Sequence, residues 1–206
     1  GTIRALVNHE VRNNQGASYT LNPGTANQLS VRGARISYFD IDTSSRQIIG
    51  SGLAFDKIYD RSYNLITSTS QFELAPTIGG LDRFCAGAAF GRYSFGQGIG
   101  FEDNIYFAGE ETSNGTQWVL DPTNFGLWAA PEMGRGAWEN WTEIDTGRSD
   151  RIAMIGGDDT ESAPLYLYIG EKNGVGDGSF LDRNGLKQGK LYVWVGDEGV
   201  DLPSHH

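Results

Sequence analysis

The chain has 206 residues, and 16 Lys and Arg against 26 Asp and Glu give it a formal net charge of −10 at pH 7. This field repels phosphate backbones and anionic lipid headgroups, so we expect neither nucleic-acid binding nor membrane insertion. The single cysteine, Cys85, excludes an intramolecular disulfide and a zinc site built from several thiols.

Short runs of apolar residues alternate with polar ones, and this period of two is typical of β-strands. Turn dipeptides such as Asn114-Gly115 and Asn184-Gly185 separate the runs. In chain order, the expected strands are residues 3–8, 35–41, 46–54, 63–68, 104–109, 116–120, 138–144, 151–155, 165–169 and 190–195. Helix is expected to be minor, with short segments at 81–91 and 130–133.

One pattern recurs along the chain: an apolar strand ends and acidic residues follow it. Glu10, Glu110, Asp158 and Asp197 mark this pattern at separations that fit a unit of roughly 40 to 50 residues. A four-stranded β-propeller blade has that length. We therefore predict an all-β fold in which short antiparallel strands form a β-propeller-like arrangement with minor helix. An irregular β-sandwich is the alternative.

No linker or low-complexity tract divides the chain, so residues 1–203 are predicted to form one domain. Residues 204–206, which include His205 and His206, are interpreted as a tail or a tag remnant. We expect the domain to be a monomeric module of a larger protein.

Carboxylates and amides beside glycine-rich turns are suited to hard cations, because Ca²⁺ takes six to eight oxygen ligands. We therefore predict that the domain binds Ca²⁺. Trp128 and Trp138 flank the stretch 129–137, which is predicted to be a surface loop, and these two side chains are expected to contact a ligand.

Five sequence blocks carry a family resemblance. In order they are Asn8-His9-Glu10, Arg83-Phe84-Cys85-Ala86-Gly87, Ile105-Tyr106-Phe107-Ala108-Gly109-Glu110-Glu111-Thr112, Gly134-Arg135-Gly136-Ala137-Trp138-Glu139-Asn140 and, after an acidic pair, Leu165-Tyr166-Leu167-Tyr168-Ile169-Gly170-Glu171-Lys172. This order resembles the PhoX-type alkaline phosphatase family and its bacterial relatives. The resemblance implies a β-propeller-related fold with Ca²⁺, and in the phosphatases iron, held by acidic side chains at strand ends.

Residue by residue, the resemblance implies these metal ligands: Glu10, Glu110, Glu111, Glu139, Asp158 and Asp159. The family pattern has a cysteine before the Glu-Glu pair, where this chain has Gly109, and Cys85 lies in a different block. We therefore predict an all-oxygen site, which favours Ca²⁺ or Mg²⁺ over ferric iron.

Two functions follow from these observations. The first is a non-catalytic, calcium-dependent, extracellular module of a bacterial adhesin that binds a peptide or glycan on a host or neighbouring cell surface. Its predicted ligand-binding residues are Trp128, Trp138, Arg83 and Arg135. The alternative is a metal-dependent phosphoesterase, in which Arg83, Arg135 or Lys172 contacts the phosphoryl oxygens.

Overall fold

The computed structural model describes residues 1–195, which form almost entirely β-structure. The strands are β1 (Thr2–His9), β2 (Tyr19–Leu21), β3 (Leu29–Val31), β4 (Arg35–Asp42), β5 (Ile48–Leu53), β6 (Lys57–Tyr59), β7 (Phe84–Phe90), β8 (Ile105–Asp121), β9 (Gly126–Ala129), β10 (Arg135–Ile144), β11 (Arg151–Asp158), β12 (Tyr166–Glu171) and β13 (Gly189–Val193). The helices are α1 (Phe180–Arg183), η1 (Thr69–Gln71) and η2 (Pro131–Met133), the last two being 3₁₀. No helix in this part of the chain is long and apolar enough to cross a membrane. Asp197, which marks the last copy of the predicted repeat, and the tail at 204–206 lie outside the described residues.

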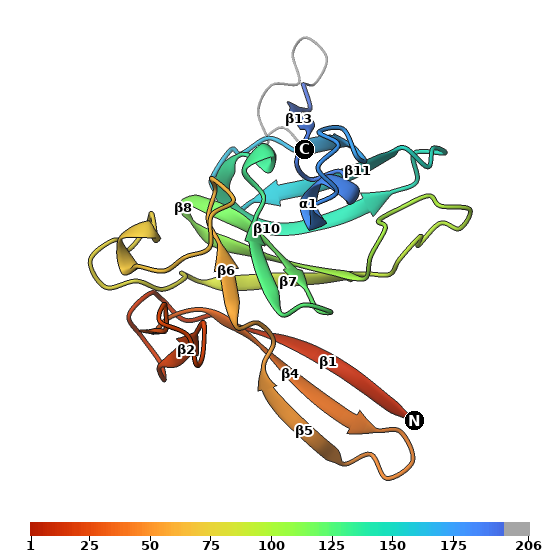
Figure 1. The fold of residues 1–206 in the computed structure, drawn as a ribbon. Coiled ribbons are helices and arrows are strands. Elements are labelled where there is room, and N and C mark those ends of the chain that lie inside the picture. The colour runs from red at the N-terminus through yellow and green to blue at the C-terminus, as the bar shows by residue number, and fades with distance from the viewer. Residues whose placement is uncertain (196–206) are drawn as a thin grey trace.

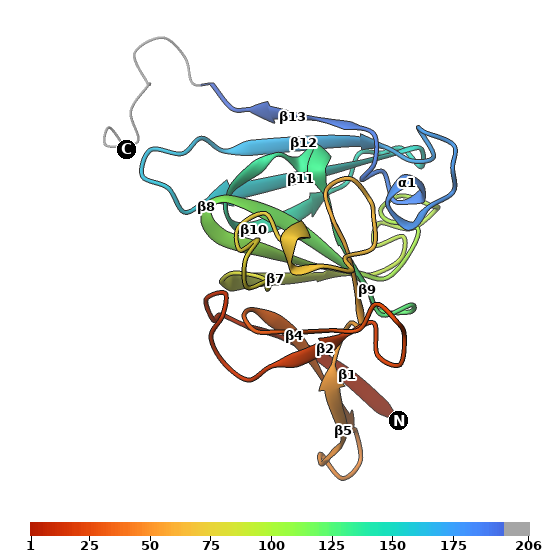
Figure 2. The same cartoon turned by 60° about the vertical axis from the view of Figure 1, so that its left-hand side comes forward.

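The strands pair into three sheets, so the prediction of an all-β fold is confirmed. The largest sheet has eight strands in the order β13-β12-β11-β10-β8-β9-β6, with β7 also paired to β8, and it curls (Figure 1, Figure 2). The others are β1-β4-β5 and β2-β3. Only the β6–β9 pair is parallel among the strand pairs of residues 1–195. Separate four-stranded propeller blades are not confirmed, because β8 and β10 to β13 form one continuous sheet.

Strand β8 is one 17-residue strand where the sequence predicts two. The expected turn at Asn114-Gly115 is present as a bulge: Asn114 has a positive φ of 62°, and the register against β10 shifts beside it. A Cβ at Gly115 would lie 2.2 Å from the Glu110 carbonyl oxygen, so only glycine permits this close return of the chain. The strand therefore continues beyond the bulge to pair with β9.

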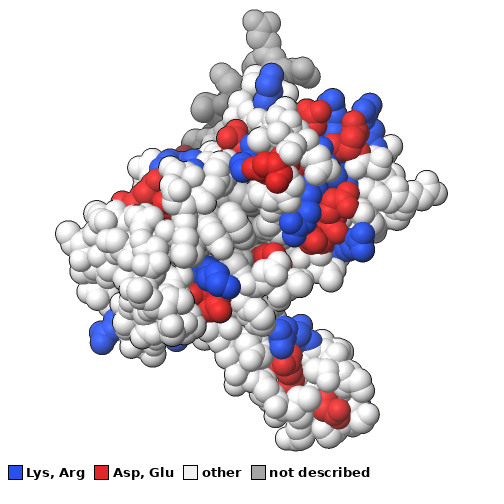
Figure 3. Space-filling view, in the orientation of Figure 1, with Lys and Arg blue, Asp and Glu red and all other residues white. Residues whose placement is uncertain are grey.

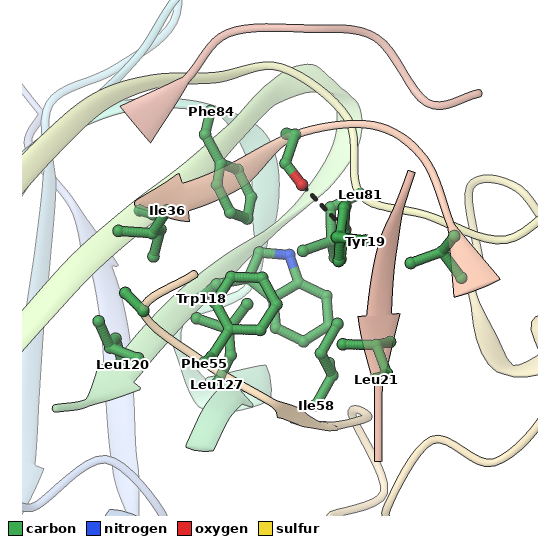
Figure 4. Close-up of a cluster of buried hydrophobic side chains, with 14 of the residues drawn as sticks. Tyr19, Leu21, Ile36, Phe55, Ile58, Leu81, Phe84, Trp118, Leu120 and Leu127 are labelled. Atoms are coloured by element: carbon green, nitrogen blue, oxygen red, sulfur yellow. Dashed lines mark hydrogen bonds between the residues drawn. The ribbon is translucent and has the colours of Figure 1, made fainter. Parts of the chain in front are cut away.

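Alternate residues of β8 face two different hydrophobic cores. Tyr106 and Ala108 belong to a first core, whose side chains come from β2, β3, β4, β6 and the end of β8 (Figure 4). Ile105 and Phe107 belong to a second core, built largely from β10, β11, β12 and α1. Because successive side chains of a strand point to opposite faces, β8 separates the two cores.

The three-stranded sheet β1-β4-β5 projects from the rest of the molecule (Figure 1, Figure 2). On one of its faces Arg4 forms an ion pair with Asp40 and lies over the Tyr38 ring. Figure 3 shows this projection and, on the visible face of the molecule, Lys and Arg lying beside Asp and Glu rather than in a patch of one sign. Glu10 directly follows β1.

Two predicted elements are wrong. The stretch 81–91 contains strand β7 rather than a helix, because its small residues lie against β8: a Cβ at Gly87 would lie 2.1 Å from the Tyr106 hydroxyl oxygen. Residues 63–68 form a turn with a single bridge from Leu65 to Tyr59, because the Asp60 carboxylate accepts the backbone N–H groups of Ser62 and Asn64. The short helix near 130–133 is confirmed as η2.

Helix α1 was missed by the sequence analysis. Its N-cap is Ser179, whose side chain accepts a hydrogen bond from the Asp182 backbone N–H. Four residues are too few to produce an amphipathic pattern, so only the cap could have indicated this helix.

Candidate metal centre

Five side chains with metal-ligating atoms converge at one place on the large sheet. They fall into two overlapping groups: Glu10, Cys85 and Glu111 form one, and Glu111, Glu139 and Asp159 form the other. Within each group the ligand atoms all lie within 4.8 Å of one another. Glu111 belongs to both groups, so the arrangement offers two adjacent positions that share one carboxylate. We call these five residues the acidic cluster.

Sheet topology brings the cluster together from distant parts of the chain. Strands β7, β8, β10 and β11 are consecutive neighbours in the sheet, and each supplies or directly precedes one member. Glu111 lies opposite Ala137 in the β8–β10 register, and the backbone N–H of Asp159 donates to the Ala137 carbonyl oxygen at 2.9 Å. The backbone N–H of Glu111 donates to the Arg83 carbonyl oxygen at 3.0 Å, which places the start of β7 beside it.

Arg83 is the cation that the structure places against these acids. Its Nη2 atom lies 2.5 Å from Glu111 Oε1 and 3.2 Å from Glu10 Oε1. The cluster holds four carboxylates, and Arg83 pairs with two of them, which leaves an excess of negative charge. Such an excess favours a bound cation over an apo state in which the carboxylates repel one another.

The electrostatics of the cluster show this repulsion. Burial raises the pKa of Glu139, and the nearby charges of Glu111 and Asp159 raise it further. The Cys85 thiol donates a hydrogen bond to the Glu111 carboxylate, and this bond together with burial raises the pKa of Cys85 to about 12. In the absence of a metal the thiol is therefore protonated, and a metal that binds it must displace that proton.

Two of the predicted ligands lie elsewhere. Glu110 points into the first core, where it is 3% exposed and accepts hydrogen bonds from the backbone N–H groups of Asp82 at 2.9 Å and Thr116 at 3.1 Å. Burial raises the pKa of Glu110 to about 7. Since neighbours on a strand face opposite ways, Glu110 and Glu111 cannot both face the cluster.

Asp158 is separated from the cluster for the same reason. It lies opposite Trp138 in the β10–β11 register, on the side of Gly136, where an added Cβ would approach Asp158 Oδ2 to 2.5 Å. Its Oδ1 atom is buried and has no hydrogen-bond partner among the described residues. The prediction that Asp158 joins the metal ligands is not supported by this placement, and Asp159 takes that position instead.

Trp138 is wrongly predicted as a ligand-binding residue. Its side chain is fully buried in the second core, where it packs against Trp141 and Tyr166. The stretch 129–137 is not a surface loop, because β9, the helix η2 and β10 occupy most of it, and Ala129, Ala130 and Met133 are fully buried. The apolar residues of this stretch therefore pack in the core instead of forming a solvent-exposed binding surface.

The remaining predicted binding residues lie at different places in the structure. Arg83 lies at the cluster, whereas Arg135 forms an ion pair with Glu73 and donates to the Asn114 carbonyl oxygen. Lys172 is buried and bonded to Glu102 and to the Gly98 carbonyl oxygen. Trp128 is half-buried in a separate groove, stacked on Tyr59. Of the predicted binding residues, only Arg83 is therefore placed to contact a ligand at the cluster.

Cys85 is the member that the sequence analysis missed. Gly109 has no room for a side chain, because a Cβ there would lie 2.6 Å from the Trp138 carbonyl oxygen. The thiol instead reaches the cluster from β7, the strand paired with β8. Recognising 84–90 as a strand, with Cys85 on the face opposite the buried Phe84, would have placed the thiol beside the acids.

The chain matches no family model, no curated protein and no solved structure.

Proposed function

We propose that the acidic cluster binds divalent or trivalent metal ions and that the domain is a metal-dependent phosphoesterase. The observation that supports this most is the position of Cys85 beside Glu10 and Glu111. The all-oxygen site was predicted because Gly109 takes the place of the family's cysteine, but Cys85 lies beside the acids from the neighbouring strand β7.

The donor set fits two kinds of ion. Glu111, Glu139 and Asp159 offer only oxygens, which suit a hard ion such as Ca²⁺. Glu10, Cys85 and Glu111 add a thiolate, which suits a transition metal such as iron or zinc. A shared carboxylate between two such positions is a feature of two-metal sites that act on phosphate esters.

The chemistry of the residues around the cluster supports phosphate as the substrate class. A bound metal would supply Lewis-acid polarisation of the phosphoryl oxygens. Arg83 would bind the same oxygens, because both of its described contacts use Nη2 and a guanidinium carries five N–H donors in a planar fork. Glu10, which also pairs with Arg83, would keep that guanidinium beside the cluster.

A second function is favoured by the all-oxygen group alone. If only Ca²⁺ binds, at Glu111, Glu139 and Asp159, the domain would be a non-catalytic, calcium-dependent binding module of an extracellular adhesin, with a peptide or glycan oxygen completing the shell. This proposal requires no role for Cys85. The two functions therefore differ in whether the thiol matters.

Hydrolysis of a chromogenic phosphate monoester tests the first proposal. The protein is stripped with EDTA, dialysed, and assayed with Ca²⁺, Zn²⁺ and Fe³⁺ singly and in pairs. We expect turnover that requires metal and is lost in Glu111→Gln, while the exposed Glu132→Gln control keeps it. Metal binding without turnover in any combination would contradict the phosphoesterase and favour the binding module.

A further inference from the structure

A groove distinct from the acidic cluster runs between the edge of the large sheet and helix α1. Its walls come from β6, β9, the β8–β9 turn and α1, and its volume is about 690 Å³, within the range of small-molecule sites. None of its lining residues belongs to the acidic cluster. They are Lys57, Tyr59, Asp121, Asn124, Gly126, Trp128, Ser179, Phe180 and Arg183.

Two stacked aromatic rings form one wall of this groove. β6 and β9 are parallel, and Tyr59 lies directly opposite Trp128, so both side chains stand on the same face of the sheet. The ring centroids lie 3.6 Å apart with an interplanar angle of 7°. Both residues are half-buried and line the groove, so part of each ring is open to it. The groove therefore offers a ligand an apolar surface.

The charged groups of the groove are already compensated within the protein. Lys57 Nζ lies 3.3 Å from Asp56 Oδ1. Arg183 Nε lies 2.6 Å from Asp103 Oδ2. Asp121, which is 3% exposed, accepts hydrogen bonds from three N–H groups of the β8–β9 turn. Because a charged ligand would have to displace one of these partners, the groove has no preference for an anion or a cation.

The neutral polar groups beside the rings have hydrogen-bonding capacity left. Within residues 1–195 the Trp128 indole N–H and the Tyr59 hydroxyl have no partner, and neither atom is buried. The Asn124 side chain uses its amide N–H₂, which leaves its carbonyl oxygen to accept. The Ser179 hydroxyl accepts a backbone N–H and keeps its own proton to donate. A wholly apolar ligand would remove these groups from water without a partner, which costs free energy.

We propose that this groove binds a neutral saccharide and does so without a metal ion. The apolar C–H face of a sugar ring would pack on the aromatic wall. Sugar hydroxyls both donate and accept, so they match the Trp128 N–H, the Asn124 carbonyl oxygen and the hydroxyls of Tyr59 and Ser179. A ligand without charge leaves the ion pairs of the groove intact. This site is independent of the phosphoesterase proposed for the acidic cluster.

Calorimetry of the full chain in EDTA tests the proposal with a panel of hexasaccharides. The neutral members are built from β1,4-linked glucose, α1,4-linked glucose, β1,4-linked mannose and β1,4-linked N-acetylglucosamine, and the charged members are oligogalacturonate and oligochitosan. We expect a neutral hexasaccharide to bind at submillimolar concentration, about tenfold more tightly than either charged one. Its affinity should not change when NaCl is raised to about 0.5 M, because no ion pair forms with the ligand.

Variants of the aromatic wall test the position of the site. Trp128→Ala should weaken binding of the neutral hexasaccharide about tenfold. Trp194→Ala, which removes a side chain 60% exposed outside the groove, should leave it unchanged. Tyr59→Phe keeps the stacked ring and removes only the hydroxyl, so we expect about threefold weaker binding and the circular dichroism of the wild type.

Three results would overturn the proposal. The first is that no neutral hexasaccharide binds at millimolar concentration, and the second is that a charged one binds as tightly as the best neutral one. The third is binding that requires Ca²⁺ and disappears in Glu111→Gln, which would place the saccharide at the metal centre.

Discussion

Glu110 and Glu111 are adjacent on one strand and have opposite environments. Glu110 is held in the first core by two backbone N–H groups and has no ionic partner among the described contacts. Glu111 faces Arg83, Cys85 and three other carboxylates, those of Glu10, Glu139 and Asp159. The comparison shows that a pair of acids in the sequence is not a pair of ligands: one stabilises the bulge of β8, and the other is placed for a cation.

The largest expected effect is the pH dependence that buried Glu110 gives to the free energy of unfolding. Burial raises the pKa of Glu110 from 4.5 to about 7, so below pH 4.5 the carboxyl is protonated in both the folded and unfolded states. As pH rises toward 7 the unfolded chain ionises first, and the free energy of unfolding falls, by up to about 3 kcal/mol. Urea unfolding in EDTA from pH 4.5 to 8 measures this.

The matched variant for that experiment is Glu110→Gln. It leaves one backbone N–H without an acceptor, which is a constant cost, but it removes the titration. The difference in unfolding free energy between wild type and variant should therefore shrink as pH rises. A difference that stays constant from pH 4.5 to 8 would show that Glu110 has an ordinary pKa.

The second prediction concerns the other member of the pair. Glu111→Gln removes the carboxylate shared by both ligand groups, so we expect metal affinity to fall by about a hundredfold, or about 2.7 kcal/mol. Glu110→Gln should change it by less than twofold. Isothermal titration with Ca²⁺ and Zn²⁺ at pH 8 measures both variants. Equal losses in the two variants would mean that the two acids act together after all.

The third prediction separates the two positions within the cluster. Cys85→Ser replaces the thiol by a hydroxyl of similar size, so we expect about tenfold weaker Zn²⁺ binding and unchanged Ca²⁺ binding. The effects on Zn²⁺ and Ca²⁺ affinity should differ because a thiolate is a soft ligand, which Zn²⁺ binds and Ca²⁺ does not. Competition titration with a chromophoric chelator measures it, and a loss of Ca²⁺ affinity of the same size would contradict two distinct positions.

The smallest expected effect concerns the second pair of adjacent acids, Asp158 and Asp159. Asp159→Asn should weaken Ca²⁺ binding about fivefold, since an amide oxygen is a poorer ligand than a carboxylate. Asp158→Asn should leave Ca²⁺ binding unchanged, because Asp158 lies beside Gly136 rather than in the cluster. Calcium titration monitored by intrinsic fluorescence measures both, and a larger effect at Asp158 would reverse the assignment.

Much of the β-structure could be predicted from short apolar runs, because strands such as β10, β11 and β12 bury apolar side chains in the second core. The long strand β8 was divided wrongly, since a turn dipeptide within a strand is the same signal as a turn between two strands. Strand β7 was missed because Ala86, Gly87, Ala88 and Ala89 give a weak alternation that only the partner strand resolves.

Only part of the metal centre could be predicted from the sequence. Block order in the sequence indicated Glu10, Glu111, Glu139 and Asp159, which the structure brings together. Which acid of each pair faces the cluster depends on strand phase, and the position of Cys85 depends on which strands are neighbours. Neither property is local in sequence, so Glu110 and Asp158 were included and Cys85 was left out.

The central claim is that Glu111 joins two cation positions. A crystal of the protein grown with Ca²⁺ and Zn²⁺, with anomalous data collected above and below the zinc edge, tests it directly. The account predicts a zinc peak bound by Cys85 and Glu111 and a calcium ion bound by Glu111, Glu139 and Asp159, with Arg83 turned away from Glu111. A cluster that stays free of ions at millimolar metal, with Arg83 still bonded to Glu111, would contradict the account.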